Sequence, residues 1–288
     1  MRRLKDLFIQ DMKTGFLKDL TSAVRDDIDL DLQIRDNYLN IYFKGNSLLR
    51  LESAGDHRYK VKLHPKFSGG VDFPDIVDDA SVRFFVSKIP SIKGNILRYG
   101  KSSLEIEYEQ MIIRANNNEP RNNSEYFIVD RQYVASKIGR FDLTGFYWPR
   151  AHRRKGQLVS PCLMEVKFAL NQDIQYVHEQ LERYYNAIRG DSAAIAEEIE
   201  TIFKQKLVLG LFNQPVNRLD AMKTLRFSPR IDEFQFILIM VDYNPFSRLL
   251  HLDKLSQLSF ADQIRIFSGG FAMWDVGMKS VSETVEND

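Results

Sequence analysis

The spacing of hydrophobic positions changes within the first hundred residues. Near the N-terminus, apolar residues recur every three or four positions, which predicts two amphipathic helices. These residues are Leu4, Leu7, Phe8, Met12, Leu17, Leu20 and Val24. From Ile28 to Ile34 the period becomes two, because each apolar residue is followed by Asp or Gln. That alternation is typical of a half-buried strand.

Three further strands follow at short spacing. They are expected over residues 38–43, 48–52 and 59–63, and the turns between them contain Gly45 and Gly55. Such short connections join antiparallel neighbours, so the strands are predicted to form a meander. Pro74 then stands where a helix can start, and residues 77–86 are apolar enough to be one. We interpret residues 1–98 as an N-terminal α+β region.

The second half predicts a different order of elements. Ser102 and Ser103 can cap a helix that runs to about Ala115, Asn171 can cap another that ends near Gly190, and a third is expected over residues 192–212. Strands are expected over residues 126–134, 141–148, 162–168, 236–241 and 263–267. The run 236–241 is apolar on both faces, which favours a central strand. The predicted fold class is α/β (α+β), with a mixed central sheet flanked by helices over residues 99–288.

Composition narrows the class of protein. The 288 residues are 44% hydrophobic and 27% charged, near the averages of globular chains, which excludes a disordered tail, a collagen-like repeat and a disulfide scaffold. The single Cys162 excludes an internal disulfide and a Cys-rich zinc site, and is typical of a reducing compartment. No stretch approaches the roughly 18 apolar residues of a membrane span, and the basic start lacks an apolar signal region. We expect a cytoplasmic protein without a membrane partner.

Opposite charges stand inside an apolar strand of the second half. Glu165 and Lys167 share one face of the expected strand 162–168, because side chains alternate with period two. Asp142 is placed likewise, between two apolar residues of the preceding strand. Burying a charge is costly unless the charge is paired or serves a site, and neighbouring strands run about 5 Å apart. Asp142 and Glu165 could therefore converge on one cation, and their hard oxygens suit Mg²⁺.

The order of these residues resembles the PD-(D/E)xK nuclease superfamily. Asp142 is followed by Glu165-x-Lys167 and then by a helix that holds Gln180 and Tyr184. The last two are similar to the Gln-x-x-x-Tyr motif of the RecB-type branch, and they are neighbours on one helix face. The resemblance covers about residues 100–270 and implies a restriction-endonuclease-like core.

Members of the superfamily often carry a further Glu in the helix before these strands. The helix expected over residues 103–115 offers Glu105, Glu107 and Glu109. At 100° per residue, Glu105 and Glu109 fall between the two apolar faces of this helix, and Glu107 falls outside. We prefer Glu109, with Glu105 second. The sequence departs from the superfamily pattern at Phe141, where Pro is the reference residue.

The resemblance implies metal-dependent hydrolysis of phosphodiester bonds, with Mg²⁺ as the cofactor and Mn²⁺ as a substitute. The implied metal ligands are Glu109, Asp142, Glu165 and the carbonyl group of Val166. Lys167 would orient the attacking water and stabilise charge on the phosphate, while Gln180 and Tyr184 would position the water or the phosphate. The expected substrate is DNA, in restriction, phage defence, repair or mobile-element biology. RNA is an alternative, because phosphate contacts read neither sugar nor base.

Basic residues gather at two places along the chain. One group lies in the loop between the Asp142 strand and the Glu165 strand, and consists of Arg150, Arg153, Arg154 and Lys155. We expect this loop to leave the sheet near the site and to bind phosphates, with Trp148 and His152 available for stacking. The other group is a period-two stripe of Lys60, Lys62, His64 and Lys66. The alternative for both groups is an ordinary solvated surface.

Other interpretations of the chain stay open. Glu165 and Lys167 could form an ion pair on a solvated edge strand. A catalytically silent relative could serve in nucleic-acid binding or assembly, although such a protein would not need to keep the full set of charged residues. The chain has no P-loop or dinucleotide motif, so a nucleotide-driven activity would need a partner protein such as a motor subunit. A homodimer is a further option, for which the sequence shows no interface pattern.

Overall fold

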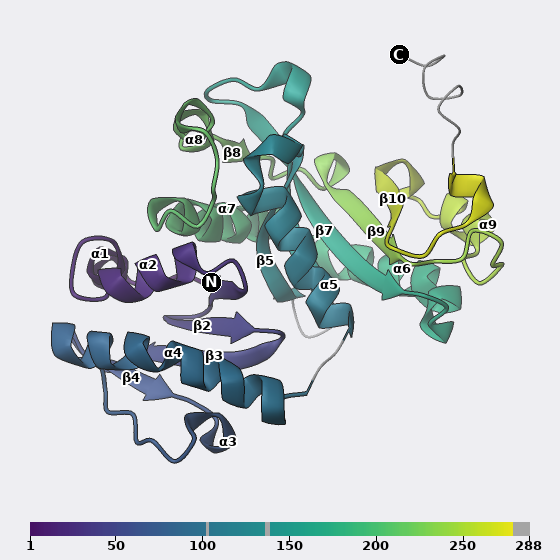
Figure 1. Ribbon diagram of the computed structural model, residues 1–288. Coiled ribbons are helices and arrows are strands. Elements are labelled where there is room, and N and C mark those ends of the chain that lie inside the picture. The colour runs from purple at the N-terminus through teal and green to yellow at the C-terminus, as the bar shows by residue number, and fades with distance from the viewer. Residues whose placement is uncertain (102–103, 136–138, 279–288) are drawn as a thin grey trace.

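The computed structural model describes residues 1–101, 104–135 and 139–278. Its N-terminal half holds a four-stranded antiparallel sheet in the order β1-β2-β3-β4 (Figure 1). The strands are β1 (Leu30–Ile34), β2 (Tyr38–Phe43), β3 (Asn46–Ser53) and β4 (Tyr59–Lys62), and the helices are α1 (Asp6–Lys13), α2 (Lys18–Asp26), α3 (Pro65–Ser68) and α4 (Asp79–Tyr99). The predicted antiparallel meander is confirmed.

The start of α4 differs from the predicted one. The helix begins after Asp78 and not at Pro74, because Asp78 forms a capping box with Ser81. The Asp78 Oδ1 atom accepts a hydrogen bond from the Ser81 N–H at 2.8 Å, and the Ser81 hydroxyl accepts one from the Asp78 N–H at 3.1 Å. These two bonds satisfy backbone donors that a helix start leaves unpaired. The helix then runs on to Tyr99, well beyond the predicted segment.

The C-terminal half is built on a six-stranded mixed sheet, as predicted in class. The order β10-β9-β7-β6-β5 describes its main path, and β8 pairs with the start of β7. The strands are β5 (Tyr126–Ala135), β6 (Gly139–Tyr147), β7 (Leu158–Phe168), β8 (Arg226–Phe227), β9 (Gln235–Val241) and β10 (Ile264–Gly269). Strands β5, β6 and β7 pair antiparallel, whereas β7, β9 and β10 run parallel. The apolar run at residues 236–241 is an inner strand, as predicted.

The helices of this half correspond only in part to the predicted ones. They are α5 (Leu104–Ile113), α6 (Val177–Ile188), α7 (Ser192–Val208), α8 (Val216–Met222) and α9 (Leu252–Ser256). The predicted cap Ser102–Ser103 lies outside the described residues. Asn171 caps a 3₁₀ turn and not α6, because its side chain accepts from the Asp173 N–H at 3.0 Å. After α5 the chain continues as a π-helical turn over Arg114–Asn118, where the sequence predicted a loop from Asn116.

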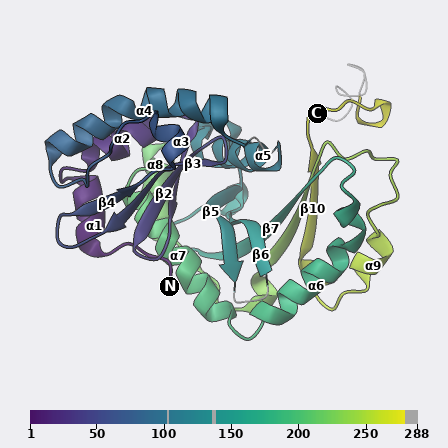
Figure 2. The ribbon, with the colours of Figure 1, turned by 90° about the horizontal axis from the view of Figure 1, so that it is seen from below.

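The helices cover the two faces of the mixed sheet unequally. α5 packs on one face through Tyr108, Ile112 and Ile113, over a cluster that includes Met164 and Val166. α6 and α7 cover the opposite face (Figure 2). Among the residues described, none of the helices is both long enough and apolar enough to cross a membrane.

The polar side of β1 is buried against the C-terminal half. Arg35 Nη1 lies 2.5 Å from Asp130 Oδ1 of β5, and Lys206 Nζ of α7 donates to Gln33 Oε1 at 2.7 Å. Arg2 reaches the other oxygen of Asp130, also at 2.5 Å. The sequence predicts a half-buried strand here, whereas Gln33 and Arg35 are buried as well. One hydrophobic core runs through both halves, so the two halves meet over a joined apolar and ionic interface.

We expect Asp130→Asn to destabilise the whole chain. Asp130 is fully buried and is the carboxylate partner of two guanidinium groups, so its loss leaves both cations without that charge. Breaking one side of a buried ion pair costs about 3 kcal/mol of unfolding free energy. Urea denaturation should report this loss as a lower midpoint. The matched control is Asp232→Asn, which removes the surface pair with Arg230 and should leave the midpoint nearly unchanged. Equal midpoints for both variants would contradict the expectation.

Candidate metal centre

The candidate centre lies where β6 separates from β7. The two strands pair from Tyr147↔Ser160 to Leu143↔Met164, and the ladder ends there. Beyond that point, the Asp142 side chain takes the place of a backbone acceptor of β6, because its Oδ2 atom accepts a hydrogen bond from the Val166 N–H of β7 at 2.9 Å. A carboxylate thus stands in the opening between two strands, with 5% of its residue surface exposed.

Helix α5 brings two more carboxylates to Asp142. One oxygen from each of Glu105, Glu109 and Asp142 lies within 4.8 Å of the others, a spacing that suits a shared cation. Glu109 is only 1% exposed, while Glu105 is half-buried. The helix is fixed at this point by Tyr108, whose hydroxyl donates to Asp242 Oδ2 at 2.7 Å and whose ring stacks on Phe168. Glu109 and Glu105, the first and second choices from the sequence, therefore both lie at the centre.

The Glu165–Lys167 pair lies next to these carboxylates and contacts α6. Glu165 Oε1 accepts from Lys167 Nζ at 2.7 Å and from Gln180 Nε2 at 2.6 Å. Gln180 also donates to the Tyr184 hydroxyl at 2.9 Å, and that hydroxyl donates to the Arg140 carbonyl oxygen at 3.2 Å. The four predicted residues form one hydrogen-bonded chain, in which Tyr184 positions Gln180 and Gln180 positions Glu165.

Gly139 is what lets Tyr184 come this close to β6. A Cβ atom at Gly139 would lie 2.0 Å from Cε1 of the Tyr184 ring, closer than any side chain tolerates. The ring also packs edge-on against Phe141, with centroids 4.6 Å apart. The residue before Asp142 thus packs against the Gln-x-x-x-Tyr helix, and its aromatic ring fills the space there.

The donor set fits a hard divalent cation. It consists of carboxylate oxygens, and two of them, Glu109 Oε2 and Glu165 Oε2, are buried without a hydrogen-bond partner among the described residues. A buried carboxylate oxygen without a partner is costly, and a bound cation would satisfy it. The compact group is Glu105, Glu109 and Asp142, whereas one oxygen of Glu165 is already bound by Lys167 and Gln180. Val166, the remaining residue of the predicted ligand set, is fully buried, and its N–H is bonded to Asp142.

Two residues of β5 that the sequence analysis missed contact Glu109. Gln132 Nε2 donates to Glu109 Oε1 at 3.0 Å, and Arg131 Nε lies 3.6 Å from Glu109 Oε2. The strand is irregular here, because its register shifts between Ile128 and Asp130 and Gln132 has a φ of 54°. Such a backbone is strained for a residue other than Gly, and strained positions cluster at functional sites. The signal in the sequence was the run of three polar residues from Asp130, which interrupts the alternation of an otherwise apolar strand.

Burial raises the proton affinity of the carboxylates at the centre. The pKa of Glu109 rises to about 8, chiefly because burial disfavours its charged form. The pKa of Asp142 rises to about 7 through burial and through the negative charge of Glu165. Burial alone would lower the pKa of the Lys167 ammonium, but its contact with Glu165 and the charge of Asp142 outweigh this and raise it. A cation among these groups would favour the ionised carboxylates instead.

The predicted basic loop lies at the far end of the β6–β7 hairpin from the centre. It follows Tyr147, whereas Asp142 lies near the start of β6, and five residues of strand span roughly 17 Å. The expectation that the loop leaves the sheet near the site is therefore wrong. Arg150, Arg154 and Lys155 are exposed.

Arg153 and Trp148 are structural parts of this loop. Arg153 Nη1 donates to Asn123 Oδ1 at 2.7 Å, and its guanidinium lies over the Trp148 ring at 5.1 Å. Trp148 is fully buried, and its Nε1 atom donates to Gln157 Oε1 at 2.9 Å, so it is not available to stack on a base. The side chain of His152 lies outside the described part of the molecule.

The second basic group does not form one strand face. Strand β4 ends at Lys62, so only Lys60 and Lys62 lie on it. His64 precedes α3 and its Nδ1 accepts from the Lys66 N–H at 3.3 Å, which places both residues at a helix start. Lys62 pairs with Glu52 at 2.7 Å, and this pairing is typical of a solvated surface.

Comparisons with known proteins do not assign the chain to a family. No protein-family model, no curated protein and no solved structure matches the chain. The assignment of the centre therefore rests on its own residues.

We expect Asp142→Asn to stabilise the metal-free protein, and more so as the pH rises. The folded pKa of Asp142, about 7, lies above the ordinary value of 3.8, so the folded state holds this proton more tightly and loses stability as the pH rises towards 7. Asn keeps an oxygen that can accept from Val166 but carries no charge. Thermal unfolding in EDTA should favour the variant by on the order of 2 kcal/mol at pH 8, and by less at pH 5. Adding Mg²⁺ should raise the midpoint of the wild type and not that of the variant. A difference that does not depend on pH would contradict the raised pKa.

Proposed function

We propose that the chain is a metal-dependent nuclease of restriction-endonuclease-like fold that hydrolyses phosphodiester bonds of DNA. The observation that carries the proposal is the cluster in the β6–β7 opening, where three carboxylates lie within 4.8 Å and a Glu–Lys pair lies beside them. The mixed sheet with helices on both faces and the order of the motif residues along the chain support the same conclusion.

The residues present define what each part of the centre would do. Glu109, Asp142 and Glu105 would hold Mg²⁺, with the free oxygen of Glu165 close by. When bound, the cation would supply a polarised phosphoryl oxygen and a water of lowered pKa. Hard oxygen ligands and a partly open site are typical of Mg²⁺ sites that also coordinate a phosphate. Glu105 is the more exposed of the helix carboxylates and would lie towards the substrate.

Lys167 would act as a cation and hydrogen-bond donor at the scissile phosphate. Its pKa is raised by Glu165 and Asp142, so its side chain stays protonated near neutral pH and is not a general base. A fixed ammonium beside the cluster would stabilise the negative charge that develops on the phosphate. Gln180 and Tyr184 would act through Glu165, which they position by hydrogen bonds.

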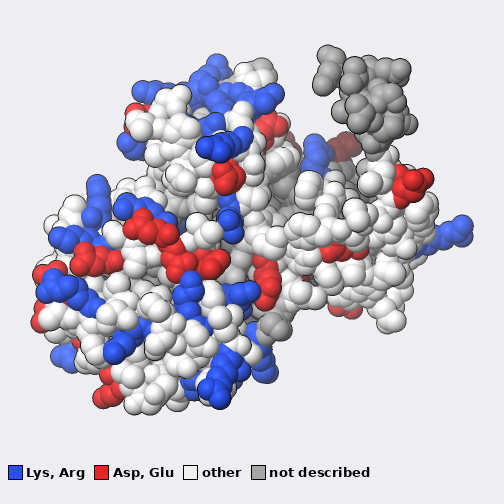
Figure 3. All heavy atoms as spheres, viewed as in Figure 1, with Lys and Arg blue, Asp and Glu red and all other residues white. Residues whose placement is uncertain are grey.

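The surface charge supports a path for the polyanion. Lys and Arg gather over the end of the molecule that carries the loop between β6 and β7 (Figure 3). Arg150, Arg154 and Lys155 lie in that loop and are exposed. The loop begins roughly 17 Å from the centre, which corresponds to about five base pairs of duplex, so these side chains would contact the backbone at that distance or farther from the scissile bond.

We expect Mg²⁺-dependent cleavage that is lost in Asp142→Asn and Lys167→Met. The first variant removes a metal ligand and the second removes the ammonium, and each loss should lower the cleavage rate by roughly 100-fold or more. Linear, circular and single-stranded DNA and RNA are incubated with Mg²⁺, Mn²⁺ or EDTA, and products are separated on gels. The matched controls are the exposed Asp253→Asn and Lys254→Met, which should cleave like the wild type.

The same assay separates the competing outcomes. Cleavage of circular DNA would establish an endonuclease, and a preference for RNA would replace the proposed substrate. Cleavage that persists in both centre variants, or that persists in EDTA, would overturn the proposal.

Neutralising the loop should weaken binding and reduce its dependence on salt. We expect Arg150→Gln, Arg154→Gln and Lys155→Gln together to lower the slope of log K against log salt by about two to three, because each phosphate contact contributes roughly 0.9. Binding to a labelled duplex in EDTA, measured by fluorescence anisotropy over a salt series, gives the slope. Three matched exposed cations, Arg83, Arg98 and Lys254, serve as the control when changed to Gln. An unchanged slope in the loop variant would exclude the loop from the interface.

A further inference from the structure

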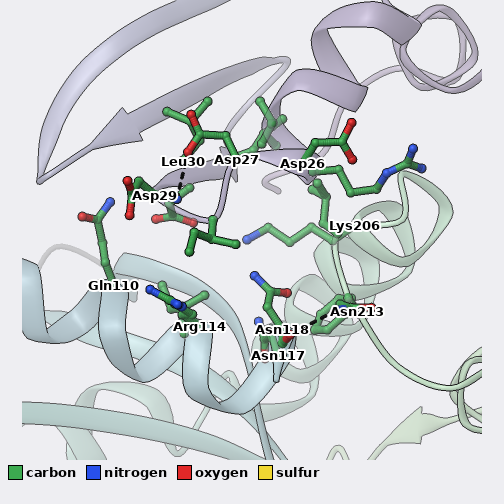
Figure 4. Close-up of a pocket in the computed structure, with 18 of the residues that line it drawn as sticks. Asp26, Asp27, Asp29, Leu30, Gln110, Arg114, Asn117, Asn118, Lys206 and Asn213 are labelled. Carbon is green, nitrogen blue, oxygen red and sulfur yellow. Dashed lines mark hydrogen bonds between the residues drawn. The ribbon is translucent and has the colours of Figure 1, made fainter. Parts of the chain in front are cut away.

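A cavity lies at the junction of the two halves, apart from the metal centre. Its volume is about 620 Å³, within the range of roughly 300–1,000 Å³ that is usual for small-molecule sites. The end of α2 and the start of β1 form one wall, and α5, the π-helical turn and α7 form the other (Figure 4). On α5, Gln110 lies about 100° to 140° away from Glu105 and Glu109, so this helix separates the cavity from the centre.

The C-terminal wall presents hydrogen-bond donors to the cavity, alongside the carboxylate of Glu107. Lys206 is 5% exposed, and its Nζ points into the space, with Gln33 as its hydrogen-bond acceptor among the described residues (Figure 4). An ammonium has three donors, so two are left for a ligand. Gln110 Nε2 is buried without a partner in the described structure, and Arg114 stands exposed at the rim. Burial lowers the pKa of Lys206 to about 8 although the charges of Asp31 and Asp130 oppose this, and an anion beside it would compensate its charge further.

The N-terminal wall presents mostly carboxylates, with Arg25 and Lys44 as its cations. Asp26, Asp27 and Asp29 line it, where α2 leads into β1. Asp27 is paired with Lys93 at 2.7 Å, whereas Asp29 lies 3.7 Å from the same ammonium. These carboxylates accept hydrogen bonds, so hydroxyl or amino groups of a ligand would suit them. Their negative charge would also repel the phosphates of a nucleic-acid strand that lay along this wall.

The rim of the cavity adds an apolar surface. Ile28 is 55% exposed and Met111 is 45% exposed, and both line the cavity. They come from opposite walls, Ile28 from the N-terminal segment and Met111 from α5. Large apolar side chains left at the mouth of a polar cavity are typical of a site that holds a flat, partly apolar group.

We propose that this cavity binds a nucleotide. The phosphate would lie on Lys206 and Arg114, the ribose hydroxyls on the carboxylates of Asp26 and Asp29, and the base against Ile28 and Met111. No simpler class of ligand matches the donors, the carboxylates and the apolar rim together. A polyamine would be repelled by Lys206, and an inorganic anion would make no contact with the carboxylate wall. The proposal does not depend on the nuclease activity, because none of these residues belongs to the metal centre.

Isothermal titration calorimetry of the full chain in EDTA tests the site. The probes are the four ribonucleoside 5′-monophosphates, the four nucleosides, ribose 5-phosphate and inorganic phosphate. We expect at least one monophosphate to bind at least tenfold more tightly than its nucleoside, ribose 5-phosphate or inorganic phosphate. Arg114→Gln and Asp29→Asn change exposed residues of the two walls, and each should weaken that binding at least tenfold. Lys206→Gln should abolish it.

Two controls keep the result separate from other causes. Arg121→Gln removes an exposed arginine outside the cavity and should bind like the wild type. Asp142→Asn should also bind like the wild type, so a failure of the nuclease activity would not affect this result. The proposal is overturned if no monophosphate binds, if inorganic phosphate binds as tightly as the best nucleotide, or if binding survives both Arg114→Gln and Asp29→Asn. Since these two variants alter exposed side chains, they test the site even if Lys206→Gln does not fold.

Discussion

The Arg131 guanidinium lies between a carboxylate of the candidate centre and a carboxylate of the N-terminal half. Its Nε atom faces Glu109 Oε2 at 3.6 Å, and its Nη1 atom lies 3.4 Å from Asp31 Oδ2. The guanidinium also lies over the Tyr42 ring at 4.6 Å. A fully buried cation needs such compensation from every side, because an unpaired buried charge costs several kcal/mol. The two halves are therefore joined by the same charge that faces the centre.

Through Arg131, residues of the N-terminal half help to position the candidate centre. Asp31 and Tyr42 come from β1 and β2, and they hold Arg131 where its charge favours the ionised form of Glu109. Asp130, the residue before Arg131, is held by Arg2 and Arg35 from the same half. The irregular stretch of β5 is thus fixed by contacts from outside its own sheet. Gln132, which follows, can keep its strained backbone because the residues before it are so firmly bound.

Local periodicity, together with the motif order of the family that the sequence resembles, pointed to the residues of the candidate centre but not to their surroundings. The period of two put Glu165 and Lys167 on one face, and the spacing of four put Gln180 and Tyr184 on one helix face; in the structure these four are hydrogen-bonded. Arg131 and Gln132 were not predicted as parts of the centre, because a register shift and a positive φ leave no periodic pattern in the sequence. The prediction that Trp148 is available for stacking is wrong, because a sequence pattern does not show which residues cover an aromatic ring. The sequence pattern also predicts that the polar side of β1 faces solvent. The residues that cover it, Asp130 and Lys206, lie about 100 to 170 residues away in the chain, so no local pattern shows them.

The position of the basic loop follows from the order of the residues in the two strands. Asp142 stands near the beginning of its strand and Glu165 near the end of the next one, so an antiparallel hairpin must bring them together at the end opposite its connecting loop. The centre consequently lies at the open end of the hairpin, where the ladder has ended and the strands need not close. An opening there admits side chains from α5 on one face and from α6 on the other without breaking a strand pair. The side chains that meet in this opening therefore come from both helices as well as from the two strands.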